Sequence, residues 1–428
     1  MHEIAEKLNG VLKDCIAERL LSSFGRRIYF PKGIVAQTAE AGKRASKYNA
    51  TVGMAFEHGE PMLLPSLSGH IRGLTAAEAV AYAPTAGNPD LRAEWLVQMR
   101  AKNPSLGDAS ISNPIVTSGL TNAIAHLGDL FVDEDDTVVL PDLFWGNYRL
   151  IFQERNGARL RTFPFFEGAG LNVPGFARAL RDAASSAAKV VTILNFPNNP
   201  TGYTPTITEM HGVVEALHSA AEQGASILVI SDDAYFGLFY DEASARESLF
   251  AHAATLHENI LAAKVDGATK EEYAWGLRVG FLTLGSTGLS REQYGALEEK
   301  IKGCIRSSIS NSSNLSQSLL LKTLSGANHD SEKALAYDRL KRRFEAVRRL
   351  VDDSRRPDCL TPLPFNSGYF MTFACEGIDA EALRQALLDR GIGTIAVGSA
   401  YLRVAYATVE EEQLEAFFSE LYETARTL

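Results

Sequence analysis

Short apolar stretches rich in β-branched residues alternate with longer amphipathic stretches through the middle of the chain. The apolar stretches lie at 137–141, 189–196, 226–231 and 281–285, and their almost unbroken hydrophobicity is typical of strands buried on both faces. Between them, apolar positions recur with a helical period, as they do at 205–223. This alternation predicts an α/β fold built on a mainly parallel sheet that is sandwiched by helices.

The pattern changes near residue 326. A charged helical stretch at 331–356 is followed by two strand-like segments, 368–375 and 401–407, and then by a terminal amphipathic helix. The first 63 residues lack the central sheet pattern. We therefore expect two domains, a large one at 64–325 and a smaller α+β one formed by both ends of the chain, 1–63 and 326–428.

Composition and charge narrow the classes of function. The 428 residues are 46% hydrophobic, enough for a sizeable core, and the net charge of −10 argues against nucleic acid or an anionic membrane surface as a partner. No apolar run approaches the ~18 residues of a membrane-spanning helix. The nine histidines form no cluster and the four cysteines are scattered, so we expect no metal centre and no disulfide framework. This cysteine usage favours a reducing, cytoplasmic location.

Polar clusters directly follow two of the predicted strands. The sequence NNPTG at 198–202 comes after one apolar stretch, and DDAYFG at 232–237 comes after the next. In a parallel sheet such clusters meet beyond the carboxyl ends of the strands, where ligands bind. Further along, Lys270 precedes Arg278 by eight residues, a pair that by itself is most simply explained as surface charge.

In this order and spacing, these motifs resemble the signature of fold-type I pyridoxal-phosphate aminotransferases of class I/II, of which aspartate aminotransferases are the best-known members. The resemblance runs from about Gly53 to Arg403, most of the chain. It implies a seven-stranded, mainly parallel sheet and the cofactor pyridoxal 5'-phosphate. It also implies transfer of an amino group between an amino acid and a 2-oxo acid.

The resemblance assigns the central chemistry to Lys270, Asp232 and Tyr235. Lys270 would form a Schiff base with the cofactor and, once released, would carry a proton as base and acid. Asp232 would keep the pyridine nitrogen protonated, and Tyr235 would donate to the cofactor's 3-oxygen. Two neighbours are alternatives. Lys264 lacks the eight-residue spacing to an arginine, whereas Asp233 competes with Asp232 because only one of two adjacent strand residues points at a ligand.

The remaining cofactor contacts follow from the same motifs. Asn199 would donate to the 3-oxygen from a turn restricted by prolines, and Trp145 of FWGNY would stack on the pyridine ring unless it is simply a core aromatic residue. For the phosphate, the strand–turn–helix pattern at 116–131 would offer free backbone N–H groups and Arg278 a charged fork. The residues of this turn are Ser118, Gly119, Leu120 and Thr121.

One position departs from the family pattern. Gly267 lies three residues before Lys270, where the family commonly has a serine that binds the phosphate. One phosphate hydroxyl is therefore absent, and whether Thr269 replaces it stays open.

Recognition of the substrate and of a second subunit is also assigned by resemblance. Arg403 would bind the substrate α-carboxylate through a bidentate pair, and Gly53 would let the backbone approach the substrate. Arg306 matches the position from which aspartate aminotransferases hold a side-chain carboxylate in the partner subunit, although two lysines close before it equally indicate a charged helix face. Tyr82 would reach the phosphate of the neighbouring subunit, which implies a homodimer with shared active sites.

The sequence thus predicts an aminotransferase. Arg306 favours a dicarboxylic pair, aspartate or glutamate with 2-oxoglutarate. The alternatives are an aromatic or broad-specificity aminotransferase, and a pyridoxal-phosphate-dependent lyase or synthase on the same fold. A transcription regulator with an aminotransferase-like sensor domain is disfavoured, because only about 50 residues precede the motif at 49–55 and the net charge is wrong for DNA.

Overall fold

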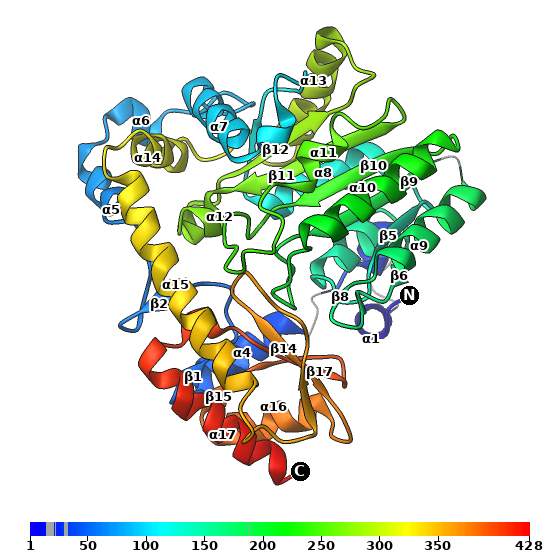
Figure 1. Ribbon diagram of the computed structural model, residues 1–428. Coiled ribbons are helices and arrows are strands. Elements are labelled where there is room, and N and C mark those ends of the chain that lie inside the picture. The colour runs from blue at the N-terminus through cyan, green and yellow to red at the C-terminus, as the bar shows by residue number, and fades with distance from the viewer. Residues whose placement is uncertain (14–20, 22, 30–32, 188) are drawn as a thin grey trace.

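A seven-stranded sheet forms the centre of the fold (Figure 1). The computed structural model describes residues 1–13, 21, 23–29, 33–187 and 189–428. All neighbouring strands of the sheet are parallel except for β12, which is antiparallel to both of its neighbours. The prediction of a mainly parallel α/β sheet is confirmed. The strand order is β4 (Ile115–Thr117), β12 (Gly280–Gly285), β11 (Ile260–Gly267), β10 (Ser226–Asp232), β9 (Lys189–Asn195), β5 (Thr137–Pro141) and β6 (Arg159–Phe163).

Helices cover both faces of this sheet because its strands are apolar on both sides. On β10, Ile227 and Val229 pack into one core with α9 (Val173–Ser186), α10 (Ile207–Glu222) and α11 (Leu249–Ala253). The alternate residues Leu228 and Ile230 pack into a second core with α8 (Leu120–Phe131) and α13 (Arg291–Ser308). This period of two is the expected geometry of a strand.

A smaller four-stranded antiparallel sheet lies below the first in Figure 1. Its order is β13 (Leu360–Pro362), β14 (Met371–Cys375), β17 (Tyr401–Val404) and β16 (Ile395–Val397). The N-terminal part of the chain joins it, because β1 (Tyr48–Asn49) pairs in parallel with β15 (Ile392–Gly393). This arrangement accords with a small domain made from both chain ends, while the boundaries at 63/64 and 325/326 stay a prediction.

Helix α15 (His329–Val351) connects the two sheets. It begins beside α14 (Asn314–Leu324) near the large sheet and runs down to α16 (Ala380–Asp389) and α17 (Leu414–Arg426), which cover the small one (Figure 1). Its lower half contributes Leu340, Phe344 and Val347 to the core around β14 and β17. The other elements are α1 (Glu3–Val11), α3 (Ser23–Arg27), α4 (Ile34–Arg44), α5 (Pro65–His70), α6 (Ala76–Val80), α7 (Pro89–Lys102), α12 (Ala268–Glu271), β2 (Phe56–Glu57), β3 (Glu60–Pro61), β7 (Phe166–Glu167) and β8 (Gly170–Leu171).

Local differences from the sequence prediction have simple causes. The strand expected at 401–407 ends at Val404, because Tyr406–Thr408 turn into a 3₁₀-helix. Residues Arg149–Arg155 form a π-helix, which apolar periodicity did not indicate. Within the described ranges, no helix has the length and apolar character needed to cross a bilayer, and no group of three or more His, Cys, Asp or Glu side chains is placed to hold a metal ion. Cys15 lies outside the described residues.

Candidate active site

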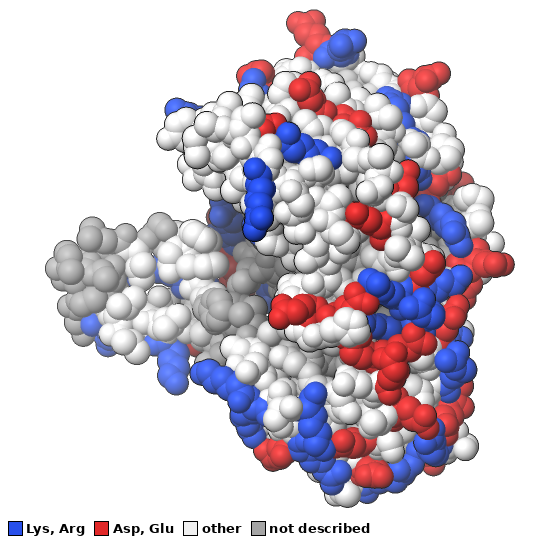
Figure 2. All heavy atoms as spheres, turned by 90° about the vertical axis from the view of Figure 1, so that its left-hand side faces the viewer, with Lys and Arg blue, Asp and Glu red and all other residues white. Residues whose placement is uncertain are grey.

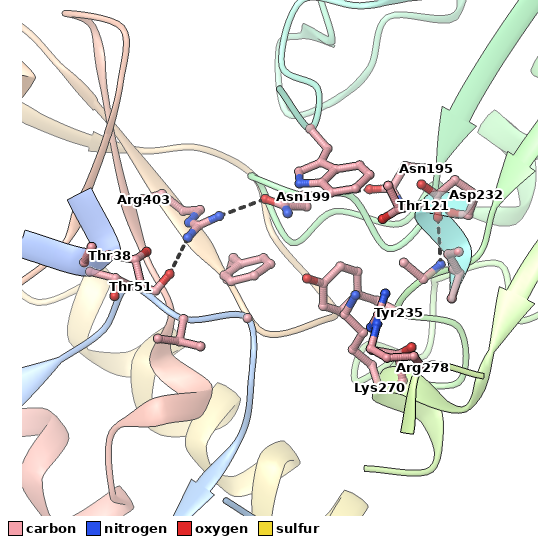
Figure 3. A pocket seen from close by; sticks show the side chains of 18 residues that line it. Thr38, Thr51, Thr121, Asn195, Asn199, Asp232, Tyr235, Lys270, Arg278 and Arg403 are labelled. Carbon is pink, nitrogen blue, oxygen red and sulfur yellow. Dashed lines mark hydrogen bonds between the residues drawn. The ribbon is translucent and has the colours of Figure 1, made fainter. Parts of the chain in front are cut away.

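A cavity of about 560 Å³ lies beyond the carboxyl ends of β9, β10 and β11, where it faces the small sheet (Figure 3). Polar residues collect there because the strand ends turn into loops at this edge. The cavity brings together most of the residues singled out in the sequence. Those that line it are Gly53, Leu120, Thr121, Trp145, Asn199, Asp232, Tyr235, Thr269, Lys270, Arg278 and Arg403.

Lys270 projects into the cavity from α12, a single helical turn that follows β11. Its Nζ lies 4.7 Å from the centre of the Tyr235 ring. Burial lowers the pKa of Lys270 to about 8, with Asp232 opposing and Arg278 adding to this effect. A substantial fraction of the amine is therefore neutral near pH 8, as a nucleophile or base requires.

Asp232 faces Lys270 across the cavity from the end of β10. One carboxylate oxygen accepts a hydrogen bond from the hydroxyl of Tyr148 and the other from the backbone N–H of Ala234 at 3.1 Å. Burial raises the pKa of Asp232 to about 6, although Tyr148 and Lys270 both lower it. The carboxylate is thus positioned to pair with a cationic ring nitrogen.

Asp233 and Lys264, the two alternatives left by the sequence, contact each other instead of the cavity. The amine of Lys264 is buried and forms an ion pair with Asp233, and it lies 3.4 Å from Asp266. The strand register explains this pairing. Lys264 lies opposite Ser231, which is on the same side of β10 as Asp233 and donates a hydrogen bond to it at 2.9 Å.

The turn before α8 lies against Arg278 at one end of the cavity. Gly119 has φ of 79°, a backbone conformation that favours glycine, and a Cβ there would fall 2.3 Å from Nη2 of Arg278 and displace that guanidinium. No side chain caps α8, which leaves its first backbone N–H groups beside the cavity-lining Leu120 and Thr121. Backbone amides and a guanidinium therefore converge here, as in many phosphate sites.

The glycine at 267 is explained by crowding. A Cβ at Gly267 would lie 2.6 Å from the carbonyl oxygen of Val279 and 2.8 Å from Cα of Gly280, so the serine typical of the family does not fit. Thr269, two residues on, lines the cavity, and its Oγ1 is buried without a hydrogen-bond partner among the described residues. This hydroxyl is available to a ligand at the same end of the cavity.

Arg403 defines the opposite end of the cavity (Figure 3). Its guanidinium donates to the carbonyl of Thr51 at 2.6 Å and to Oδ1 of Asn199 at 3.1 Å, and it lies 4.4 Å from the centre of the Phe370 ring. The side chain is only 2% exposed, its Nε has no partner, and no carboxylate of the described residues pairs with it. Burial lowers its pKa to about 10. Such a cation calls for an anionic ligand.

Four residues assigned from the sequence are not among those that line the cavity. One is Gly119, in the turn next to the lining residue Leu120. Ser118 is another, and its backbone N–H donates to Oδ1 of Asn122 at 3.1 Å. Tyr82 is 89% exposed on the surface. Arg306 is exposed near the end of α13, where it donates to Oγ of Ser310 at 2.5 Å. Tyr82 and Arg306 therefore contribute nothing to the cavity of their own chain.

The cavity also contains residues that the sequence did not single out. Thr51 and Val52 stand beside Gly53 in a motif already noted, so that motif was a usable signal. Thr38 and Ala39 come from α4, which carries no motif. The other unassigned lining residues are Asn195, Ala234 and Phe370.

Residues 73–421 match the sequence family described as aminotransferase class I and II. The chain belongs to this family. It is therefore an aminotransferase, and enzymes of this family work with pyridoxal phosphate. Similar curated proteins carry aminotransferase names. A probable aspartate/prephenate aminotransferase of Aquifex aeolicus is 25% identical over 352 residues, which span 78% of this chain and 81% of that protein.

Solved structures agree with the family. An aminotransferase from Anaerococcus prevotii superimposes with a TM-score of 0.83 at 25% identity, covering 93% of this chain and 98% of that one. The kynurenine aminotransferase of Pyrococcus horikoshii superimposes with a TM-score of 0.78 over 97% of this chain and 99% of that one. At 17% identity, the second comparison speaks for the fold alone.

The cavity of this aminotransferase fits pyridoxal phosphate in its chemistry. The unpartnered hydroxyl of Thr269 and the Arg278 side chain beside Gly119 would suit an anion at one end. Asp232 would offer a carboxylate to the ring nitrogen in the same cavity as the amine of Lys270. The buried Arg403 remains for a second anion at the other end.

Proposed function

We propose that the protein binds pyridoxal 5'-phosphate in the 560 Å³ cavity and transfers an amino group between an amino acid and a 2-oxo acid. One observation carries this proposal most directly. Arg403 is a buried cation without a carboxylate partner among the described residues, and it faces the cavity that holds Lys270 and Asp232. A substrate carboxylate on Arg403 would place the rest of an amino acid between that guanidinium and the lysine amine.

The cofactor contacts follow from the geometry. Gly119, Leu120, Thr269 and Arg278 would hold the phosphate, and Ser118 would lie beside them in the same turn. Asp232 would pair with the ring nitrogen. The residues at the ring itself would be Trp145 against its face and Asn199 and Tyr235 at its 3-oxygen.

Lys270 would move the proton of the reaction. When bound, pyridoxal phosphate supplies an electron-accepting ring that makes the proton on the substrate α-carbon removable. The pKa of about 8 lets the Lys270 amine take up that proton and release it again at a neighbouring carbon. Asn199 accepts from Arg403 through Oδ1, so it would orient the arginine for the substrate while its amide nitrogen donates to the cofactor.

A homodimer with shared sites is supported by one surface. Large apolar side chains are exposed on α6 and α14, on the segments that flank α5 and α6, and at the end of α13, and α14 packs on both α5 and α6. Figure 2 shows this side of the molecule, and the surface in the upper part of that view consists mostly of uncharged residues. Burying such a patch favours association. The exposed apolar residues are Leu63, Ile71, Val80, Tyr82, Ile309 and Leu315.

Tyr82 and Arg306 lie in or beside this apolar surface. We therefore place them at the partner's cavity: Tyr82 at its phosphate and Arg306 at the side chain of its substrate. This assignment favours a dicarboxylic substrate, aspartate or glutamate with 2-oxoglutarate, as the names of similar proteins also suggest.

A second candidate, an aminotransferase for aromatic or other uncharged amino acids, is favoured by a different observation. The wall beside Arg403 is formed by Thr38, Ala39, Val52 and Phe370, all of them uncharged. Unless the partner subunit's Arg306 reaches this wall, a second substrate carboxylate would be desolvated without a cation, which is costly.

Visible spectroscopy of the purified protein with pyridoxal phosphate tests these alternatives. Candidate amino acids are added one at a time, and 2-oxo acid formation is measured in parallel. We expect aspartate or glutamate to change the cofactor absorption and to yield their 2-oxo acids, whereas a response to aromatic amino acids alone would support the second candidate. A lyase or synthase would respond to an amino acid without consuming a 2-oxo acid.

Two variants complete this experiment. Arg403→Gln should abolish the response, whereas Arg342→Gln, which removes an exposed arginine from α15, should preserve it. If Lys270→Ala kept both the absorption and the turnover, the proposed function would be wrong.

A further inference from the structure

Two glutamates directly follow Lys270, and both are buried. Glu271 ends α12 and Glu272 is its C-cap residue. Buried carboxylates are rare unless they are paired, because burial disfavours the charged form. These two side chains have partners on two other helices, neither of which is close to them in sequence.

The partners form a compact ionic cluster, defined here as Lys102, Glu271, Glu272, His329 and Lys333. The amine of Lys102, at the end of α7, lies 2.5 Å from Oε1 of Glu271. The amine of Lys333, on α15, lies 3.1 Å from the same oxygen and 2.6 Å from Oε1 of Glu272. Nε2 of His329, the first residue of α15, lies 2.7 Å from Oε2 of Glu272. Three helices therefore meet at the two carboxylates.

These contacts favour the ionised form of both carboxylates. Although burial works against the charge, Lys102 and Lys333 lower the pKa of Glu271, and Lys333 and His329 lower that of Glu272. The hydrogen bond that His329 makes to Glu272 raises the pKa of His329, and Asp330 acts in the same direction while burial and Lys333 oppose it. Charged hydrogen bonds of this kind are short and directional, so they fix the geometry of the groups they join.

Helix α12 needs such support. It spans only four residues, Ala268–Glu271, and a single turn is not stable without tertiary contacts. The backbone after it is also unusual, because Tyr273 has φ of 51° and Arg278 has φ of 54°, a region that side-chain-bearing residues seldom occupy. Backbone of this kind persists only where its surroundings hold it.

Helix α15 provides an anchor that extends beyond the cavity. Its 23 residues span about 35 Å. At its upper end it contacts Glu271 and Glu272. Further along it, Arg343 donates to the carbonyl of Ala407 at 2.6 Å and pairs with Glu410 at 2.7 Å, beside the strand that carries Arg403. Helix α15 thus connects the turn that carries Lys270 to the small sheet that carries Arg403.

We propose that the ionic cluster is a positioning device that holds the Lys270 turn and ties it to α15, with Glu272 bound to both α15 residues, His329 and Lys333. The proposal rests on the proposed function for the importance of the Lys270 position. The cluster acts on position because the charges that set the Lys270 pKa are Asp232 and Arg278, together with burial. A displaced turn would carry the Lys270 amine toward water and raise its pKa.

The test compares Glu272→Gln with the unaltered full chain, both without cofactor and with pyridoxal phosphate added. Amide hydrogen exchange is measured by peptide, and the labelling of Lys270 by an amine reagent is followed against pH. We expect exchange in the peptide containing 268–277 to rise by about ten-fold or more, while exchange in β9 and β10 stays within about two-fold. The midpoint of Lys270 labelling should rise by about one pH unit.

Glu411→Gln is the matched control. Glu411 pairs with Arg342, an exposed residue of α15 that lies away from the cavity. Removing this carboxylate should change neither the exchange at 268–277 nor the labelling of Lys270. Should Glu272→Gln fail to fold, His329→Gln removes only an outer contact of the cluster and should still raise exchange at 268–277 by about three-fold.

Unchanged exchange at 268–277, or an equal rise in every strand, would overturn the proposal, because the cluster would then contribute nothing or only global stability. Both measurements on the cofactor-free chain are independent of catalysis. A failure of the proposed aminotransferase activity would appear instead as the absence of any spectral response to amino acids.

Discussion

Tyr148 donates its hydroxyl hydrogen to Oδ2 of Asp232, and both side chains are buried. This contact stabilises the ionised carboxylate, because burial alone raises the pKa of Asp232 and the tyrosine hydrogen bond lowers it again. The hydroxyl comes from the FWGNY motif, three residues after Trp145. One short motif therefore supplies an aromatic wall of the cavity and a support for its acid.

The variant Tyr148→Phe tests the value of this hydrogen bond. Phenylalanine fills the same space, and the loss of the donor should raise the pKa of Asp232 by about one unit. Because the proposed pairing with the ring nitrogen requires ionised Asp232, the acidic limb of the kcat/KM profile should move to higher pH by the same amount. The rate below the limb should fall about ten-fold.

Tyr240→Phe is the control for that change. The hydroxyl of Tyr240 is buried without a partner among the described residues and lies outside the cavity lining. Its removal should leave the acidic limb in place. An equal shift in both variants would show that the effect comes from general loosening of the core.

Lys264 and Lys270 should have opposite effects on stability, although they are six residues apart. The folded state lowers the pKa of Lys270 to about 8 from 10.5, so protonation at neutral pH costs folding free energy. Replacement by methionine removes that cost and should stabilise the cofactor-free protein on the order of 1–2 kcal/mol, allowing for partial solvent screening. The gain should be complete below about pH 8 and should vanish as pH rises toward 10.5.

Lys264→Met should destabilise the protein. Despite burial, Asp233 and Asp266 raise the pKa of Lys264, so its charge stabilises the fold at neutral pH. Removal leaves Asp233 buried and unpaired, which should cost about 3–5 kcal/mol. Urea unfolding of both variants at neutral pH measures the two values, and equal signs would contradict the assigned environments.

The pKa of Lys270 is itself measurable in the cofactor-free protein. Modification by an amine reagent requires the neutral amine, so the rate at Lys270 should rise with a midpoint near pH 8. Arg278→Met removes a cation that lowers this pKa, and the midpoint should therefore move up. Peptide mass spectrometry gives the rate at each lysine, with exposed Lys43 as the reference for reagent decay. A midpoint that falls in the variant would contradict the effect assigned to Arg278.

The sheet and the main cavity residues were predictable because each depends on short-range information. Strands buried on both faces leave unbroken apolar runs, and the runs at 137–141 and 226–231 match β5 and β10 within one residue. The rule for parallel sheets then indicated the edge at which the polar motifs meet, and the resemblance to the aminotransferase family selected the residues there. Asn199, Asp232 and Lys270 accordingly line one cavity.

The residues that escaped prediction depend on long-range pairing. Tyr148 meets Asp232 across 84 positions and Lys264 meets Asp233 across 31, and only the strand register decides which side chains share a face. Nothing in the local sequence distinguishes Glu271 and Glu272 from surface charges, because their partners lie on the distant helices α7 and α15. For Tyr82 and Arg306, the structure of a single chain does not test the assigned roles, because both residues are exposed to solvent.

Thr269 and Gly267 allow a test of whether the Thr269 hydroxyl takes the place of the phosphate-binding serine that the family resemblance leads one to expect at position 267. Introducing the serine by Gly267→Ser should lower the stability of the protein, since the new Cβ would lie 2.6 Å from the Val279 carbonyl oxygen and the contacted atoms belong to the backbone.

Thr269→Val should leave the cofactor-free protein at least as stable as the unaltered protein, because the Oγ1 that it removes is buried without a partner among the described residues. The same variant should weaken pyridoxal phosphate binding about five- to ten-fold, the value of one hydrogen bond. Absorbance titration gives the affinities and thermal unfolding the stabilities, with Thr269→Ser as the variant that keeps the hydroxyl. Unchanged affinity in Thr269→Val would mean that this hydroxyl does not contact the phosphate and that backbone amides and Arg278 bind it without Thr269.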